Sequence, residues 1–198
     1  MLIGIAGDLG SGKTLTATYL ACKFFLEGKK IYTNYTLKGI PHKRIYSLRE
    51  LNEIHSGAFI GDELWTWVDS RLSQKLVNKM TSLILAKSRK RDLTIVWTAQ
   101  LVNTIEKRIR LMTERILFPE TLPRNADVPK YVRVQIVDRK LMPIGSFVFP
   151  ARVYFNFYDT REEVLPPIEM YEDIIGKKLS KETYLKIVNG ELDVEALI

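Results

Sequence analysis

Short apolar runs alternate with stretches of helical periodicity over the first two thirds of the chain. The strand-like runs cover residues 2–6, 30–33, 45–46, 58–61 and 93–100, and the helix-like stretches cover residues 15–25, 47–54, 73–88 and 103–112. The run at 93–100 is apolar almost throughout, which is typical of a strand covered on both faces. Strands that alternate with helices predict an α/β fold, with a mainly parallel sheet and right-handed crossovers.

The last third of the chain has a different pattern. Residues 131–138 alternate apolar and polar side chains with a period of two, residues 147–158 are aromatic and strand-like, and residues 141–145 form a turn between them. These segments predict antiparallel strands added to the edge of the parallel core. Pro166 and Pro167 end this region, and a charged, helix-leaning tail follows. We therefore divide the chain into a domain over residues 1–165 and a tail over residues 166–198.

Composition and charge limit the kind of protein. A chain of 198 residues with 46% hydrophobic and 27% charged residues suits one ordinary globular domain with a small extension. Its net charge of +7 favours an acidic partner such as nucleic acid, with a solvated basic face as the equal alternative. The single cysteine, Cys22, cannot form an intrachain disulfide, which fits a reducing compartment.

The sequence gives no sign of a membrane segment or of an export leader. The sequence has no run of 18 apolar residues, and its first residues read as a strand rather than as an export leader. We therefore expect a cytoplasmic protein without a transmembrane segment of its own.

The glycine-rich loop after the first strand is the strongest candidate for chemistry. It matches the P-loop pattern Gly-x-x-x-x-Gly-Lys-[Ser/Thr] at every fixed position with Gly7, Asp8, Leu9, Gly10, Ser11, Gly12, Lys13 and Thr14. Its backbone N–H groups and the positive end of the following helix suit an anion. Lys13 can reach the β- and γ-phosphates of a nucleotide, and the Thr14 hydroxyl can ligate Mg²⁺. The strand before the loop and the helix after it argue against a chance match.

A pair of acids follows the strand at residues 58–61. Ligands bind beyond the carboxyl ends of parallel strands, so Asp62 is expected near Mg²⁺ and Thr14. Glu63 can orient and deprotonate an attacking water. This second acid favours hydrolysis over phosphate transfer, and a simple acidic turn is the alternative interpretation.

These motifs, with the strand end Trp97-Thr98-Ala99-Gln100, resemble the FtsK–HerA group of P-loop ATPases over roughly residues 1–160. Within the group the chain is similar to the small genome-packaging ATPases of membrane-containing icosahedral viruses, especially archaeal ones. The segment from Ser88 to Gln100 also resembles Zot-like ATPases of filamentous phages. The resemblance implies a RecA-like core, ATP as the nucleotide, a homo-oligomeric ring and double-stranded DNA as the substrate that is moved.

The resemblance also implies roles for single residues. Gln100 would sense the γ-phosphate, with a strand end satisfied by backbone groups as the alternative. An arginine finger is expected from a neighbouring subunit. Arg89, Arg91, Arg108 and Arg110 are all candidates, Arg89 is preferred, and the basic cluster at residues 87–91 could instead contact DNA phosphates. For Trp65 and Trp67 we expect packing in the core or at an interface.

Four functions follow from these features, in order of preference. The first is a DNA-translocating motor that packages a viral genome, recruited by capsid or virion membrane proteins and associated with the virion or the host cytoplasm. The second is a Zot-like or conjugation-type ATPase that drives assembly or export. The third is a small-molecule kinase, and the fourth is a nucleotide switch with little hydrolysis, which Glu63 argues against.

Overall fold

The fold is built around one mixed sheet. The computed structural model describes residues 1–68, 78, 82–84, 86, 92–102, 107–124 and 128–197. Within these residues the sheet has eight strands in the order β3-β2-β4-β5-β1-β6-β7-β8. Their bounds are β1 Leu2–Ala6, β2 Ile31–Thr33, β3 His42–Arg44, β4 Gly57–Gly61, β5 Leu93–Ala99, β6 Arg115–Leu122, β7 Tyr131–Val137 and β8 Pro143–Pro150.

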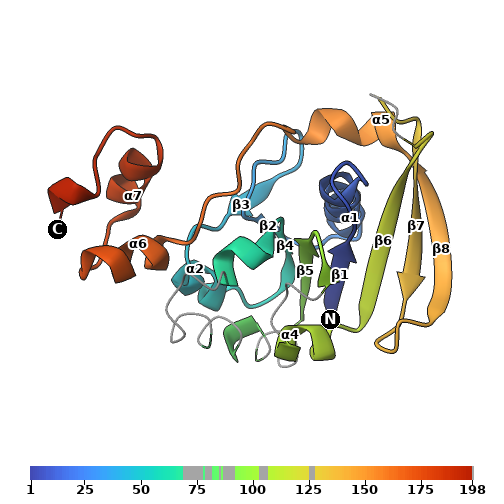
Figure 1. Cartoon of the computed structure of the whole chain (residues 1–198), viewed down its shortest axis with the longest axis horizontal. Helices are drawn as coiled ribbons and strands as arrows, with labels where there is room; N and C mark the ends of the chain where they lie inside the picture. Colours follow the sequence, from blue (N-terminus) through green and yellow to red (C-terminus); the bar gives the residue numbers. More distant parts are fainter. Residues whose placement is uncertain are drawn as a thin grey trace.

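The helices of the described residues lie on both sides of this sheet (Figure 1). They are α1 Lys13–Leu26, α2 Leu48–Glu53, α4 Lys107–Met112, α5 Ala151–Tyr154, α6 Ile168–Ile175 and α7 Lys181–Val188, with short 3-10 helices η1 Leu64–Val68, η3 Phe155–Phe157 and η4 Glu195–Leu197. No helix of these residues has the length and apolar character needed to cross a membrane.

Six neighbouring strands of the sheet, in the order β3-β2-β4-β5-β1-β6, are parallel, as the alternation of strands and helices predicts. Every residue of β1, β4 and β5 is buried, because helices cover both faces of the sheet there. Leu15, Leu20 and Phe24 of α1 belong to the core on one face. Leu51 of α2 and Trp67 of η1 belong to the core on the other. The carboxyl ends of β1, β4 and β5 therefore meet at one edge between two packed layers.

The end of the chain confirms the expected antiparallel addition. β6 pairs with β7 and β7 with β8, both antiparallel. Val132 and Val134 of β7 are fully buried on the side of α1, while Arg133 and Gln135 are exposed. Tyr19 of α1 stacks on aromatic rings of β8, which closes this side of the core.

Several element boundaries differ from the sequence prediction. The edge strand predicted at residues 45–46 lies at His42–Arg44 instead. Residues 151–157 form α5 and η3 rather than a strand, because Tyr154 packs edge-on against Tyr19 and Phe149 beside α1. The strand β6 was not predicted from the sequence. Pro119 interrupts its apolar pattern. Within β6, however, the residues that pair with β1 are Arg115–Leu117, so the proline lies beyond that pairing.

Two predicted helices are described only in part. The helix predicted at residues 73–88 is represented by the helical residues 78, 82–84 and 86, and the rest lies outside the described residues. The one predicted at residues 103–112 is confirmed at its end by α4. The preferred finger Arg89 and its neighbour Arg91 also lie outside the described residues.

The tail is helical, as predicted, and it contacts α2. Ser47 caps α2 by accepting a hydrogen bond from the Glu50 N–H, as the sequence spacing predicts. The buried carboxylate of Glu169 in α6 accepts further hydrogen bonds from the first N–H groups of α2, at Leu48 (3.0 Å) and Arg49 (3.2 Å). A negative charge at this end of a helix is stabilising, so Glu169 fastens α6 to α2.

Candidate active site at the carboxyl edge of the sheet

The glycine-rich loop joins β1 to α1 at the carboxyl edge of the sheet. Gly10 and Gly12 have φ angles of +73° and +96°, a conformation that residues with a Cβ rarely adopt. Gly12 is also the N-cap of α1. The loop therefore turns its backbone at the positive end of the helix, where an anion is stabilised by the helix dipole and by N–H groups.

The Lys13 side chain folds back over this loop. Its Nζ donates hydrogen bonds to the carbonyl oxygens of Gly7 and Asp8, both at 2.8 Å. Burial lowers the pKa of Lys13, while the nearby charges of Asp62 and Glu63 act in the opposite direction. The structure thus places an ammonium group at the loop, where the motif requires one for phosphate binding.

A buried carboxylate lies beside the start of α1. Asp62, which follows β4, accepts hydrogen bonds from the Thr14 hydroxyl at 2.9 Å and from the Thr98 hydroxyl at 2.6 Å. Burial raises the pKa of Asp62, and the two hydroxyl hydrogen bonds and Lys13 oppose that rise. Asp62 and Thr14 thus offer two adjacent oxygen ligands of the hard kind that Mg²⁺ takes. Mg²⁺ usually keeps several waters and substrate oxygens, so a site with only these two protein groups fits it.

Glu63 occupies a strained backbone position beside Asp62. Its φ is +43°, which is uncommon for a residue other than glycine. Its N–H donates to the Thr98 hydroxyl at 2.7 Å, and its carbonyl accepts from the Thr66 hydroxyl at 2.9 Å. Burial, followed by the charge of Asp62, raises the pKa of Glu63. A carboxylate whose pKa is moved toward neutrality suits a general base.

Two residues that hold this pair of acids were missed in the sequence. Asn34, in the loop after β2, accepts from the Asp62 N–H at 2.8 Å and donates to the Asp62 carbonyl at 2.7 Å. Thr98, at the end of β5, contacts both Asp62 and Glu63. A polar residue near the end of a mostly apolar strand was the signal for Thr98. Asn34 carried no such signal, because it lies in an irregular loop.

The remaining candidate residues lie just after β5, on α4 and in η1. Gln100 is exposed just after β5, and its carbonyl accepts a hydrogen bond from the Gly7 N–H at 3.3 Å. Arg108 and Arg110 lie on α4, at the opposite edge of the sheet from the glycine loop (Figure 1). Trp67 is buried and donates to the Leu165 carbonyl at 2.9 Å, which confirms core packing. The side chain of Trp65 lies outside the described residues.

A pocket of about 800 Å³ opens on the side of the loop that carries the acids. Its lining includes Lys13, Thr14, Asp62 and Glu63, together with the segment 158–164. This pocket brings together the loop, the ammonium, the oxygen ligands and the candidate base. This pocket is therefore the candidate active site.

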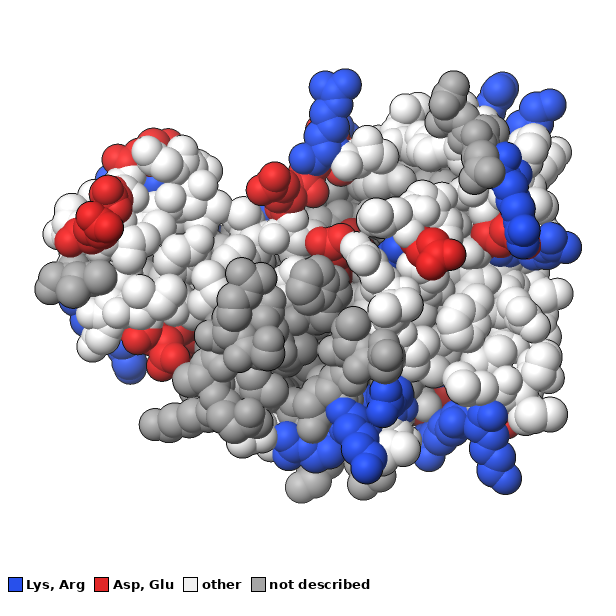
Figure 2. Space-filling model, viewed as in Figure 1, with Lys and Arg blue, Asp and Glu red and all other residues white. Residues whose placement is uncertain are grey.

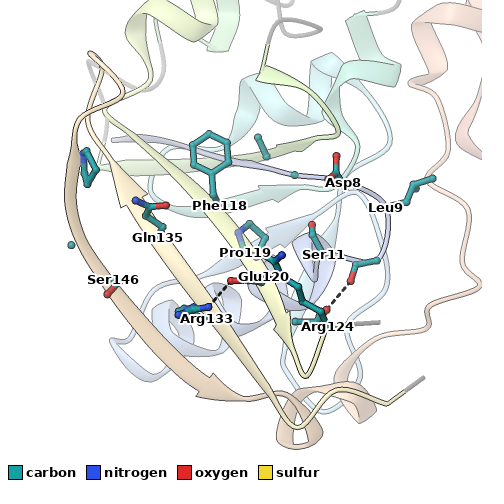
Figure 3. A pocket seen from close by; sticks show the side chains of 16 residues that line it. Asp8, Leu9, Ser11, Phe118, Pro119, Glu120, Arg124, Arg133, Gln135 and Ser146 are labelled. Carbon is teal, nitrogen blue, oxygen red and sulfur yellow. Dashed lines mark hydrogen bonds and ion pairs between the residues drawn. The ribbon is translucent and has the colours of Figure 1, made fainter. Parts of the chain in front are cut away.

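A second hollow of about 920 Å³ lies on the other flank of the loop, against the exposed face of β6–β8 (Figure 3). Its lining includes Asp8, Leu9 and Ser11 of the loop but none of the chemical groups just described. In it Glu120 pairs with Arg133 at 2.8 Å and also with Arg124. The charges of these two arginines are thus already met by a carboxylate.

Replacing Thr98 by Val is expected to weaken both the fold and the site. The change leaves the Glu63 N–H without its acceptor and takes one donor from Asp62, so the free energy of unfolding should fall by about 1–3 kcal/mol. Turnover should fall about tenfold or more, since Glu63 loses the contact that fixes its strained backbone. The matched control is Thr94→Val, because Thr94 is buried at the other end of β5. Denaturant unfolding and ATP hydrolysis that are equal in the two variants would contradict this role.

Solved structures share this fold at low sequence identity. The N-terminal domain of zonular occludens toxin from Neisseria meningitidis aligns with a TM-score of 0.59 and 15% identity, over 80% of this chain and 98% of that one. A second solved structure, an ATPase domain, aligns with a TM-score of 0.55 and 11% identity, over 81% of this chain and 84% of that one. The genome packaging NTPase B204 from Sulfolobus turreted icosahedral virus 2 has a TM-score of 0.49 and 10% identity, over 74% and 95%. By sequence, the chain matches no family model and no curated protein. The chain thus has the RecA-like fold of P-loop ATPases, the kind of protein that its sequence resembles.

Proposed function

We propose that this chain is a Mg²⁺-dependent ATPase. The observation that carries the proposal is the hydrogen bond of 2.9 Å between the Thr14 hydroxyl and the Asp62 carboxylate, in a pocket that also holds Lys13 and Glu63. In this proposal the loop N–H groups and Lys13 bind the β- and γ-phosphates, and Thr14 and Asp62 hold the metal. Bound Mg²⁺ would neutralise charge on the phosphate oxygens.

Glu63 is the proposed base for the attacking water. It accepts a proton as the water oxygen bonds to the γ-phosphorus and the bond to the β-phosphate oxygen breaks, which leaves ADP and phosphate. Asn34 and Thr98 keep Asp62 and Glu63 in place for this step. Gln100 is the proposed γ-phosphate sensor, because it lies next to Gly7 at the start of the loop.

We further propose that hydrolysis drives translocation of double-stranded DNA, in a homo-oligomeric ring that packages a viral genome. The motif resemblance and the net charge of +7 support this step. Figure 2 shows Lys and Arg side chains along the lower and right edges of the molecule. Of the described residues, Lys107, Arg108 and Arg110 on α4 and Arg139 and Lys140 in the β7–β8 turn are basic residues suited to DNA phosphates. Capsid or virion membrane proteins are the proposed recruiting partners, in the host cytoplasm or the virion.

Arg89 of a neighbouring subunit remains the proposed finger, with Arg91, Arg108 and Arg110 as alternatives. A cation supplied by the neighbour makes turnover depend on assembly. Arg89→Ala subunits retain their own P-loop, and Lys13→Ala subunits retain the finger. Mixing the two is therefore expected to restore part of the activity.

ATP hydrolysis measured with and without double-stranded DNA tests the proposed function. We expect DNA to stimulate phosphate release several-fold, and activity to rise more than linearly with protein concentration. Hydrolysis that DNA leaves unchanged but lipid vesicles stimulate would favour the alternative, a Zot-like or conjugation-type ATPase for assembly or export. Transfer of the γ-phosphate to a nucleoside acceptor would contradict hydrolysis and indicate a kinase.

A further inference from the structure

The segment 158–164 lines the nucleotide pocket together with the catalytic groups. Every residue of this segment lines the pocket, as do Lys13, Thr14, Asp62 and Glu63. The segment follows η3 and comes about a hundred residues after the two acids in the sequence. A ligand that fills the pocket therefore contacts both this segment and the catalytic groups.

Hydrogen bonds and an ion pair hold this segment to the chain that leads into β3. The Glu162 carboxylate accepts hydrogen bonds from the Thr36 N–H at 2.9 Å and the Thr36 hydroxyl at 3.0 Å. It also pairs with the Arg44 guanidinium at 2.7 Å, and both side chains are largely buried. Just before the segment, the Phe157 carbonyl accepts from the Lys38 N–H at 2.7 Å. The wall is thus fixed at both ends before any ligand binds.

Arg161 lies between these two fixed points. Its N–H donates to the Asp159 carboxylate at 2.9 Å, and the Glu162 N–H donates to the Asp159 carbonyl at 3.2 Å, which forms a turn at the pocket. Arg161 is exposed, and its guanidinium makes no hydrogen bond or ion pair with the part of the chain that the structure describes. The turn therefore presents a cation whose charge is not met by a carboxylate there.

The other arginines near the glycine loop differ in this respect. Arg124 and Arg133 line the second hollow, and both pair with Glu120 (Figure 3). The carboxylate of Glu162, the immediate neighbour of Arg161, is likewise taken up by Arg44. Arg161 is thus the arginine that lines the pocket of Lys13 and the acids while keeping its guanidinium available to a ligand.

We propose that Arg161 binds a phosphate group of the nucleotide held by its own subunit, and that the contacts of Glu162 with Thr36 and Arg44 keep it in position. This inference rests on the proposed ATPase function and adds a binding residue to the same site. A guanidinium matches phosphate oxygens with two parallel hydrogen bonds, and charge-assisted bonds of this kind are the strong ones. The fixed wall keeps the cost of ordering the arginine small.

Binding of a fluorescent ATP analogue with Mg²⁺ to the purified full-length chain tests this inference. Arg161→Ala is expected to raise the Kd about tenfold, the effect of losing one charge-assisted hydrogen-bonded contact, and Arg161→Lys to raise it less. Arg152→Ala is the matched control, since Arg152 is exposed on α5 and does not line the pocket. Glu162→Gln should also weaken binding, because it loosens the fixed wall. Thermal unfolding of the Arg161 variants should match that of the unaltered chain.

Mixing variants tests whether Arg161 acts in its own subunit. Arg161→Ala mixed with Lys13→Ala should restore no activity, because each subunit then lacks one residue of its own pocket. Restored activity would overturn the inference. An unchanged Kd for Arg161→Ala would also overturn it, provided that Lys13→Ala weakens binding in the same assay. The proposed ATPase function would be compatible with either result. An unaltered chain that binds no nucleotide would overturn the inference and the proposed function together.

Discussion

Lys13→Ala is expected to weaken nucleotide binding strongly and to abolish productive turnover. The side chain donates hydrogen bonds to the carbonyls of Gly7 and Asp8, and in the proposed complex its ammonium moves to the β- and γ-phosphates. Losing this cation should weaken binding of Mg-ATP on the order of 10²-fold or more, because its hydrogen bonds to phosphate are charge-assisted. The fold should persist, since α1 is held by buried residues such as Leu15, Leu20 and Phe24.

Calorimetric titration with Mg-ATP, alongside thermal unfolding, measures this effect. Lys23→Ala is the matched control, because Lys23 lies on the exposed side of the same helix. A Lys13→Ala variant that turns over ATP at the normal rate would show that the glycine loop is not the nucleotide site.

Glu63→Gln is expected to separate binding from chemistry. Gln has almost the same shape and can keep the backbone contact with Thr98, so the variant should bind Mg-ATP normally. It lacks a group that can accept the proton of the attacking water, so turnover should fall on the order of 10²-fold or more. Asp62→Asn should instead weaken Mg-ATP binding, because Asp62 is the proposed metal ligand beside Thr14.

Parallel measurements of binding and turnover compare these two variants. Glu53→Gln, at the exposed end of α2, controls for the loss of a carboxylate elsewhere. If Glu63→Gln and Asp62→Asn had the same defect in Mg-ATP binding, the separate roles of the two acids would be wrong.

Much of the site could be predicted because its signals are local. The glycine loop lies between a strand and a helix that are adjacent in sequence, and Asp62 follows a fully buried strand. The rule that parallel strands end at one edge then predicts that Thr14 and Asp62 meet. Their distance of 2.9 Å is in agreement with that prediction, although they are 48 positions apart.

The contacts that hold the site could not be predicted in the same way. Thr36 and Glu162 are 126 positions apart, and no local pattern links them. The strand β6 was missed because Pro119 breaks its apolar pattern, and it is stabilised by pairing with β1 and β7. Aromatic residues at 151–157 suit a strand by propensity, but packing against α1 makes them helical. In each case tertiary contacts outweigh the local preference.

The proposed Mg²⁺-dependent ATPase is best tested by the release of phosphate from ATP. The purified chain is assayed with double-stranded DNA present, once with Mg²⁺ and once with excess EDTA. We expect steady hydrolysis to ADP and phosphate with Mg²⁺, almost none with EDTA, and almost none for Glu63→Gln in either condition. Hydrolysis at equal rates in the unaltered chain and in Glu63→Gln, or no hydrolysis by a folded chain that binds Mg-ATP, would contradict it.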